Sequence, residues 1–109
     1  MRWGLRGYSW GTLLEALVTE GLADHFAVEL MGSPVPPWCM LFPETELPAY
    51  VELARPELDD PAFDYDEWFR RDGTGYTLGY YIVAQYLASH PGSSAASLVG
   101  ADAEAFRPD

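Results

Sequence analysis

Two carboxylates, Glu20 and Asp24, are the residues of this chain whose type and spacing point most directly to chemistry. They lie four residues apart in the apolar stretch 12–31, so on a helix turning about 100° per residue they share one face. The other residues within about 60° of Glu20 are all apolar: Leu13, Ala16, Leu17, Ala23, Ala27 and Met31. A buried, ionised carboxylate is costly unless it is paired, hydrogen-bonded or bound to a metal. Glu20 therefore needs a partner from outside its own helix.

Three uses of two neighbouring carboxylates can be compared. A glycosidase places its carboxyl groups on opposite sides of the scissile bond, which neighbours on one helix face cannot do. A di-metal bundle needs Glu-x-x-His motifs on partner helices, and the sequence contains none. A zinc site of the gluzincin kind takes two His from one helix and a Glu from a second, and an acid one turn beyond that Glu orients a His ligand. The Glu20–Asp24 spacing fits this third use, although such spacing is common on helices.

The helix that must position the pair is predicted to span 12–31. Thr12 and Glu15 have the spacing of a capping box at its start, and Gly32 followed by Pro34 ends it. The side opposite Glu20 is also apolar and carries Leu14, Val18, Leu22 and Phe26. Apolar residues on both sides predict a helix that is covered on two faces.

Glycine at position 21 is unusual in the middle of a helix. It costs about 1 kcal/mol relative to alanine, so we expect another backbone to pass close to it. The last long helix is predicted over 76–89, where Gly75, Gly79 and Val83 form a face small enough for tight helix contact.

Shorter elements fill the rest of the chain. Residues 1–11 are predicted to be a loop, 33–43 a Pro-rich extended segment and 46–55 a short helix. Asp64 and Glu67 form a second potential capping box, for a helix through Arg71, inside an acidic run that is predicted to be a solvated face. Residues 93–106 are predicted to form one or two short helices. The predicted fold is therefore all-α, with four to five helices and no sheet.

Composition excludes several classes of protein and of site. The 109 residues carry 17 acidic and 6 basic side chains, a formal charge of −11, which excludes the electrostatic footprint of a nucleic-acid-binding protein. A single cysteine, Cys39, rules out an internal disulfide and a Cys-based zinc site, and is predicted to be a small buried residue. No signal peptide and no apolar run of about 18 residues is present, so no membrane association is predicted and the expected location is cytoplasmic.

Three segments together resemble a known family: residues 11–26 (GTLLEALVTEGLADHF), 36–38 (PPW) and 75–87 (GYTLGYYIVAQYL). They are similar to the C-terminal half of a bacterial family of unknown function that is predicted to consist of zinc-dependent proteases. The resemblance covers about residues 2 to 106. In that family an H-E-x-x-H helix lies just before the position that matches 2–3, and the Glu that matches Glu20 is taken as the third zinc ligand.

The resemblance implies a zincin-like metallopeptidase domain, of which residues 1–109 would be a single, partial, C-terminal portion. Glu20 would bind zinc, and Asp24, in the second shell of the metal, would hold a His ligand in place. Tyr76 or Tyr80 would line the catalytic cleft and donate to a developing oxyanion. The substrate of the intact form would be a peptide or protein.

The sequence departs from this pattern in its histidines, because it contains no H-E-x-x-H. His25 lies about 140° around the helix from Glu20 and is predicted to be a solvated or hydrogen-bonded helix residue, while His90 is predicted to cap a helix end. Zinc is therefore predicted to bind weakly or not at all to this chain alone, which would be inactive. The chain would be either a fragment that begins at an internal Met or a shortened paralogue. The competing hypothesis is a non-enzymatic acidic helical module that binds a protein partner through an exposed apolar helix face.

Overall fold

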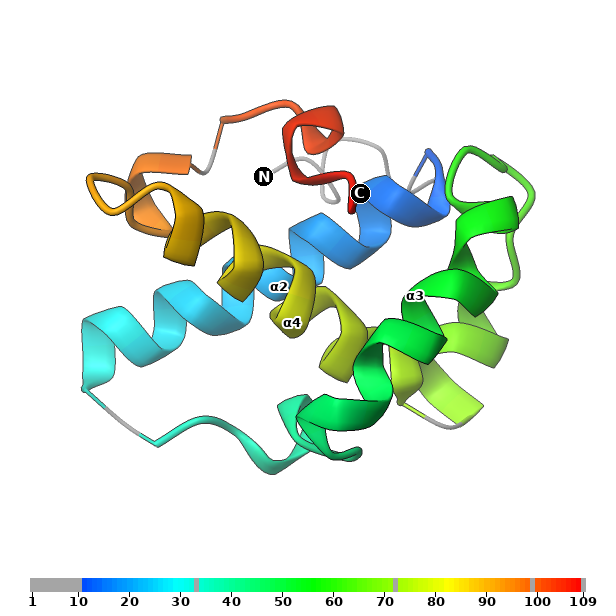
Figure 1. The fold of residues 1–109 in the computed structure, drawn as a ribbon, viewed down its shortest axis with the longest axis horizontal. Coiled ribbons are helices and arrows are strands. Elements are labelled where there is room, and N and C mark those ends of the chain that lie inside the picture. Colours follow the sequence, from blue (N-terminus) through cyan, green and yellow to red (C-terminus); the bar gives the residue numbers. More distant parts are fainter. Residues whose placement is uncertain (1–10, 33, 72, 99, 109) are drawn as a thin grey trace.

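Helices joined by short turns make up the computed structural model, which describes residues 11–32, 34–71, 73–98 and 100–108 (Figure 1). In chain order the elements are α2 (Leu13–Met31), η1 (Pro37–Cys39), η2 (Glu44–Glu46), α3 (Leu47–Ala54), η3 (Arg55–Glu57), η4 (Asp66–Arg71), α4 (Thr74–Ser89), η5 (Ala96–Leu98) and η6 (Ala103–Phe106). η4 is a π-helical segment, and the other η elements are 3-10 turns. No strand occurs in the described ranges, so the predicted all-α class is confirmed. The loop predicted for 1–11 lies outside the described residues, except for Gly11.

The ends of α2 are formed by the residues that the sequence indicates. The Thr12 hydroxyl accepts from the Glu15 backbone N–H at 3.2 Å, and the Glu15 carboxylate accepts from the Thr12 N–H at 3.1 Å. Gly32 adopts the left-handed conformation, with φ of 64°, and ends the helix. The predicted capping box and glycine stop are both confirmed.

The centre of the fold is a crossing of α2 and α4, in blue to cyan and in yellow in Figure 1. A Cβ atom built on Gly21 would lie 2.7 Å from the carbonyl carbon of Gly79, and one built on Gly79 would lie 3.2 Å from the carbonyl carbon of Leu17. The two backbones therefore touch, which confirms the close approach predicted from Gly21. The core that includes this crossing contains the fully buried side chains Leu13, Leu17, Leu58, Leu78 and Val83.

The two halves of α2 differ sharply in burial. All of its buried residues lie between Leu13 and Leu22. Beyond the crossing Phe26 is 45% exposed, Leu30 70% and Met31 73%. The prediction that α2 is covered on two faces along its length is therefore wrong for 23–31. The reason is geometric: α4 crosses α2 instead of running beside it, so it covers only the part near the crossing (Figure 1).

Ala23 and Ala27, which were predicted to face the interior beside Glu20, are exposed as well. They follow the crossing in the sequence, so the same geometry explains both. The face that carries the carboxylates is thus buried at its N-terminal end and open at its C-terminal end.

The Pro-rich segment is tied to α4 by one side chain. Thr77 is 1% exposed, and its hydroxyl donates to the Trp38 carbonyl at 2.8 Å and accepts from the Leu41 N–H at 3.1 Å. The short helix predicted over 46–55 is confirmed as α3, and Pro56 follows it inside the 3-10 turn η3. The last long helix begins two residues earlier than predicted, at Thr74, and ends at Ser89 as predicted.

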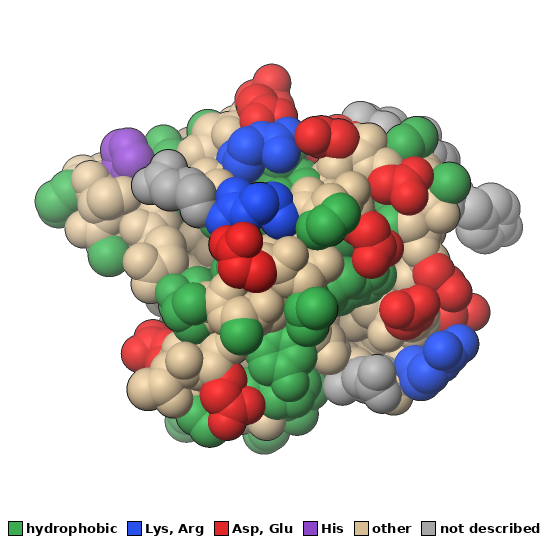
Figure 2. Space-filling view, turned by 45° about the vertical axis from the view of Figure 1, so that its right-hand side comes forward, with side chains coloured by type: hydrophobic (Ala, Val, Ile, Leu, Met, Phe, Trp, Pro, Cys, Tyr) green, Lys and Arg blue, Asp and Glu red, His purple; other side chains and the backbone are tan. Residues whose placement is uncertain are grey.

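Acidic side chains are dispersed over the face shown in Figure 2 instead of forming one patch. In the acidic run most carboxylates are exposed, as predicted for a solvated face: Asp59, Asp60, Asp64, Asp66 and Glu67. None of the described helices combines the length and the apolar character needed to cross a membrane.

Candidate functional site

Glu20 lies on α2 next to the crossing residue Gly21, and its side chain is half-buried. Burial raises the pKa of the Glu20 carboxyl, and the negative charge of Asp24 raises it further. A side-chain hydrogen bond with Tyr65 acts in the opposite direction and favours the carboxylate. Among the residues that the structure describes, no arginine forms an ion pair with Glu20. Glu20 is therefore a carboxylate whose charge is only partly compensated.

An aromatic wall stands on the Glu20 side of the site. The ring of Phe69 stacks on Tyr65, with centroids 4.7 Å apart, and meets Tyr76 edge-on at 5.1 Å. Phe69 fits here because Gly75 has no side chain: a Cβ on Gly75 would lie 2.7 Å from the tip of its ring. Burial raises the pKa of the Tyr65 hydroxyl, and the charge of Glu20 and the contact with Tyr76 add to this effect. Tyr65 therefore stays protonated and is a hydrogen-bond donor at neutral pH.

Asp24 is held by the segment that follows the prolines. Its Oδ2 atom accepts from the Trp38 indole N–H at 3.2 Å and from the Cys39 thiol at 3.3 Å. Burial raises the pKa of the Cys39 thiol, and the hydrogen bond to Asp24 raises it further. Cys39 is buried, as predicted. The η1 turn thus fixes one oxygen of Asp24, and the predicted role of Asp24 in orienting a histidine remains a prediction.

Tyr80 lies on the Asp24 side of the site. Its ring stacks on His25, with centroids 3.7 Å apart, and Nε2 of His25 lies 2.9 Å from the Tyr80 carbonyl oxygen. Burial lowers the pKa of His25, and burial together with Cys39 and Asp24 raises that of Tyr80. The structure therefore brings the two predicted tyrosines to different sides: Tyr76 reaches Glu20 through Tyr65, and Tyr80 adjoins Asp24.

Both histidines are committed to other contacts. His25 is hydrogen-bonded and stacked within the helix pair, as predicted. Nδ1 of His90 lies 2.9 Å from the Tyr86 carbonyl oxygen at the C-terminal end of α4, which agrees with the predicted cap.

Sequence reasoning did not find Tyr65, Trp38 and Cys39 as neighbours of the two acids. Tyr65 lies inside the acidic run, where charge suggested a solvated face. The signal that could have found it is a set of aromatic residues that interrupts the run: Phe63, Tyr65, Trp68 and Phe69. Two of these, Trp68 and Phe69, are buried.

The fold and site define an all-α domain with a carboxylate pair between Tyr65 and Tyr76 on one side and Tyr80 on the other. A family model described as "Predicted Zn-dependent protease (DUF2268)" matches residues 6–107. The chain belongs to this family, as the resemblance of its motifs indicates. No curated protein and no solved structure matches it.

Zinc in catalytic sites takes three protein ligands and keeps one open position. In the described ranges no three His, Cys, Asp or Glu side chains lie close enough to hold a metal ion together. Asp24 has one oxygen occupied by Trp38 and Cys39, and His25 is bonded to Tyr80. The described residues therefore do not fit a zinc ion by themselves.

Proposed function

We propose that this chain contributes to the active site of a zinc-dependent metallopeptidase by supplying the carboxylate ligand, Glu20, and one wall of the cleft. The H-E-x-x-H helix, which is absent from these 109 residues, would supply the other ligands and the general base. Asp24 would orient a histidine of that helix. The substrate would be a peptide or protein.

The observation that carries the proposal is the state of Glu20. It is half-buried, lies one turn from a second acid and has no arginine partner among the described residues, so its charge is costly where it stands. Purely structural acids in such positions are normally paired. A cation at Glu20 would relieve both the burial cost and the repulsion from Asp24.

The neighbouring hydroxyl groups define what this chain can do during the reaction. Tyr65 orients the Glu20 carboxylate by its hydrogen bond. Tyr76 and Tyr80 would line the cleft on either side of the acids, and a protonated phenol placed there donates to negative charge that develops on a carbonyl oxygen. In the absence of the H-E-x-x-H helix the chain offers no general base, so no activity is expected from it alone.

The test is a zinc titration, by calorimetry, of the longest natural product of this gene that carries H-E-x-x-H in frame with these residues. Glu20→Gln should weaken zinc binding and abolish peptidase activity, because Gln offers no charge to the metal. Asp24→Asn should lower zinc affinity and activity by about 10–100-fold, as is usual for the loss of a group that orients a metal ligand.

Glu15→Gln is the matched control, because it changes a carboxylate of the same helix while the amide oxygen can still accept in the capping box. Glu29 is unsuitable as a control, since its carboxylate accepts from the Ala95 N–H at 2.7 Å. Unchanged zinc affinity and turnover in Glu20→Gln would refute the proposal.

A second candidate function rests on the open end of α2. Phe26, Leu30 and Met31 are exposed there, a feature typical of surfaces that bind another protein. Under this alternative the chain is a non-enzymatic module that binds a protein partner through 23–31. Light scattering tests whether the chain associates and whether Leu30→Glu prevents it; a monomer with Glu20-dependent zinc binding would exclude this alternative.

A further inference from the structure

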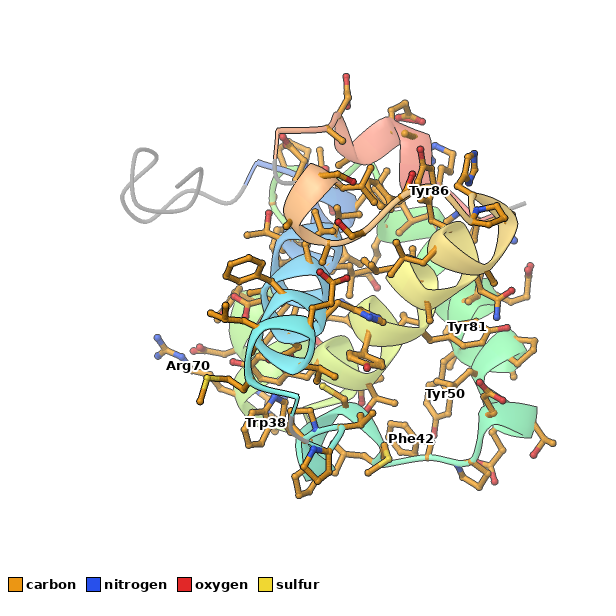
Figure 3. All side chains as sticks on the ribbon, turned by 90° about the vertical axis from the view of Figure 1, so that its left-hand side faces the viewer. Trp38, Phe42, Tyr50, Arg70, Tyr81 and Tyr86 are labelled. Carbon is orange, nitrogen blue, oxygen red and sulfur yellow. The ribbon has the colours of Figure 1, made fainter. Side chains whose placement is uncertain are left out.

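A cavity of about 360 Å³ lies between the Pro-rich segment, the start of α3 and the middle of α4. Its walls are mainly apolar or aromatic, and include Val35, Phe42, Leu47, Tyr80, Tyr81 and Ala84. Figure 3 labels two of these wall residues, Tyr81 on α4 and Phe42 on the segment that precedes α3. The volume is at the lower end of the range for small-molecule sites, and it has room for one large side chain but not for a long piece of peptide.

The cavity shares a wall with the candidate site. Cys39 and Tyr80 line it, and the same two residues adjoin Asp24: the Cys39 thiol donates to Asp24 at 3.3 Å, and both Cys39 and Asp24 raise the pKa of Tyr80. Asp24 is one helical turn from Glu20. A group bound in the cavity is therefore separated from Asp24 by the side chains of Cys39 and Tyr80.

The cavity walls are held in place by contacts that do not need a ligand. Thr77 joins the Pro-rich segment to α4 through its hydrogen bonds to Trp38 and Leu41. On the α3 side, Phe42 stacks on Tyr50 with centroids 4.4 Å apart (Figure 3). Because the Thr77 hydroxyl already donates its proton to the Trp38 carbonyl, it has no proton left to donate to a ligand. A preformed cavity of this kind favours an apolar occupant.

We propose that this cavity is a specificity pocket that holds one large apolar side chain, aromatic or branched aliphatic, of the peptide substrate beside the Glu20–Asp24 pair. The assignment rests on the proposed peptidase function. Glu44, exposed at the cavity, and the net charge of −11 disfavour acidic peptides. The substrate class is therefore neutral or basic peptides with a bulky apolar residue near the cleaved bond.

The experiment follows ¹H–¹⁵N NMR spectra of the labelled chain during titration with N-acetyl-L-phenylalanine amide. We expect saturable shifts at the amides of Thr77, Tyr81 and Ala84, with a dissociation constant on the order of 1 mM, the value expected for a ligand of this size. N-acetyl-L-aspartic acid amide should bind at least about tenfold more weakly, because no Lys or Arg lines the pocket, Glu44 repels the carboxylate, and burying its charge among apolar walls is costly.

Ala84→Phe, which fills the pocket from α4, should weaken binding of the phenylalanine probe at least about tenfold. Ala88→Phe is the matched control, because Ala88 is exposed one turn later on the same helix and lies outside the pocket. Thermal unfolding of both variants checks that they fold, and Ala84→Leu replaces Ala84→Phe if that variant does not. Equal binding by Ala84→Phe and Ala88→Phe, or shifts confined to 23–31, would overturn the proposal.

The same titration on Glu20→Gln distinguishes a failure of the proposed peptidase function from a failure of the proposed specificity pocket. Probe binding should be unchanged there, because the pocket does not include Glu20. Probe binding without any effect of Glu20→Gln on zinc would overturn the proposed function alone. Glu20-dependent zinc binding without probe binding would overturn the specificity pocket alone.

Discussion

The two halves of α2 have similar apolar composition but opposite environments. Residues 13–22 are packed against α4 through the Gly21–Gly79 contact, whereas Phe26, Leu30 and Met31 are open to solvent. Glu20 and Asp24 lie at the boundary between the halves, and both are half-buried. A carboxylate there is partly shielded from water but can still be reached by a ligand. Apolar composition thus determines which residues can be buried, and the position of the crossing helix determines which of them are.

The largest effect is expected for Gly21→Ala, which places a methyl group against the Gly79 backbone. Alanine normally stabilises a helix interior by about 1 kcal/mol relative to glycine, but here the helices must separate, and we expect a loss of about 3 kcal/mol or more in the free energy of unfolding. Urea denaturation measures this loss of stability. Gly92→Ala, at a glycine with no atom near its missing Cβ, should be close to neutral. A Gly21→Ala variant as stable as wild type would contradict the crossing.

The next largest effect compares one leucine from each half of α2. Leu17 is completely buried, so Leu17→Ala should cost about 2–5 kcal/mol through lost burial and the cavity that remains. Leu30 is 70% exposed, and Leu30→Ala should change stability by less than about 0.5 kcal/mol. Both are measured by denaturant unfolding of the purified chain. A cost at Leu30 comparable to that at Leu17 would mean that 23–31 is covered in solution, as it would be by self-association.

The smallest effect concerns Glu20, at the boundary between the two halves of α2, and depends on pH. The folded state raises the pKa of Glu20, so the folded chain holds this proton more tightly than the unfolded chain. Stability from this group is therefore present at low pH and is lost as the pH rises through the raised pKa. Without metal, Glu20→Gln should be more stable than wild type at neutral pH, and this advantage should shrink toward zero in acid.

Thermal unfolding from pH 3 to pH 8 in the presence of a chelator measures this difference. Glu15→Gln is again the control and should show no such gain at neutral pH. If Glu20→Gln were less stable than wild type at neutral pH, Glu20 would be a structural acid and the boundary would have no electrostatic cost for a cation to relieve.

Local signals in the sequence predicted much of the fold. Thr12, Glu15 and Gly32 act within one turn of the helix ends, and Gly21 signals a contact because a mid-helix glycine has a local cost. The angle at which α4 crosses depends on packing between residues about 60 positions apart. For that reason the sequence indicated an exposed apolar helix face but not that 23–31 would be the exposed part.

The candidate site was predicted only in part, for the same reason. The pairing of Glu20 with Asp24 follows from helix periodicity alone. Tyr65 reaches Glu20 from the residue before η4, and Trp38 reaches Asp24 from the Pro-rich segment, so both contacts depend on tertiary folding. The roles predicted for Glu20, Asp24, Tyr76 and Tyr80 remain predictions until zinc binding is measured.

Cys39 gives this protein a built-in reporter of motion at the site. It is the only cysteine of the sequence, it is 5% exposed, and its thiol is bonded to Asp24. Thiol reagents attack the thiolate, which burial and Asp24 disfavour in the closed state. Labelling must therefore wait for the 34–43 segment to open, and its rate follows the free energy of that local opening. The kinetics of one uncatalysed reaction on the unmodified chain thus measure how often the wall between the carboxylate pair and the neighbouring cavity comes apart.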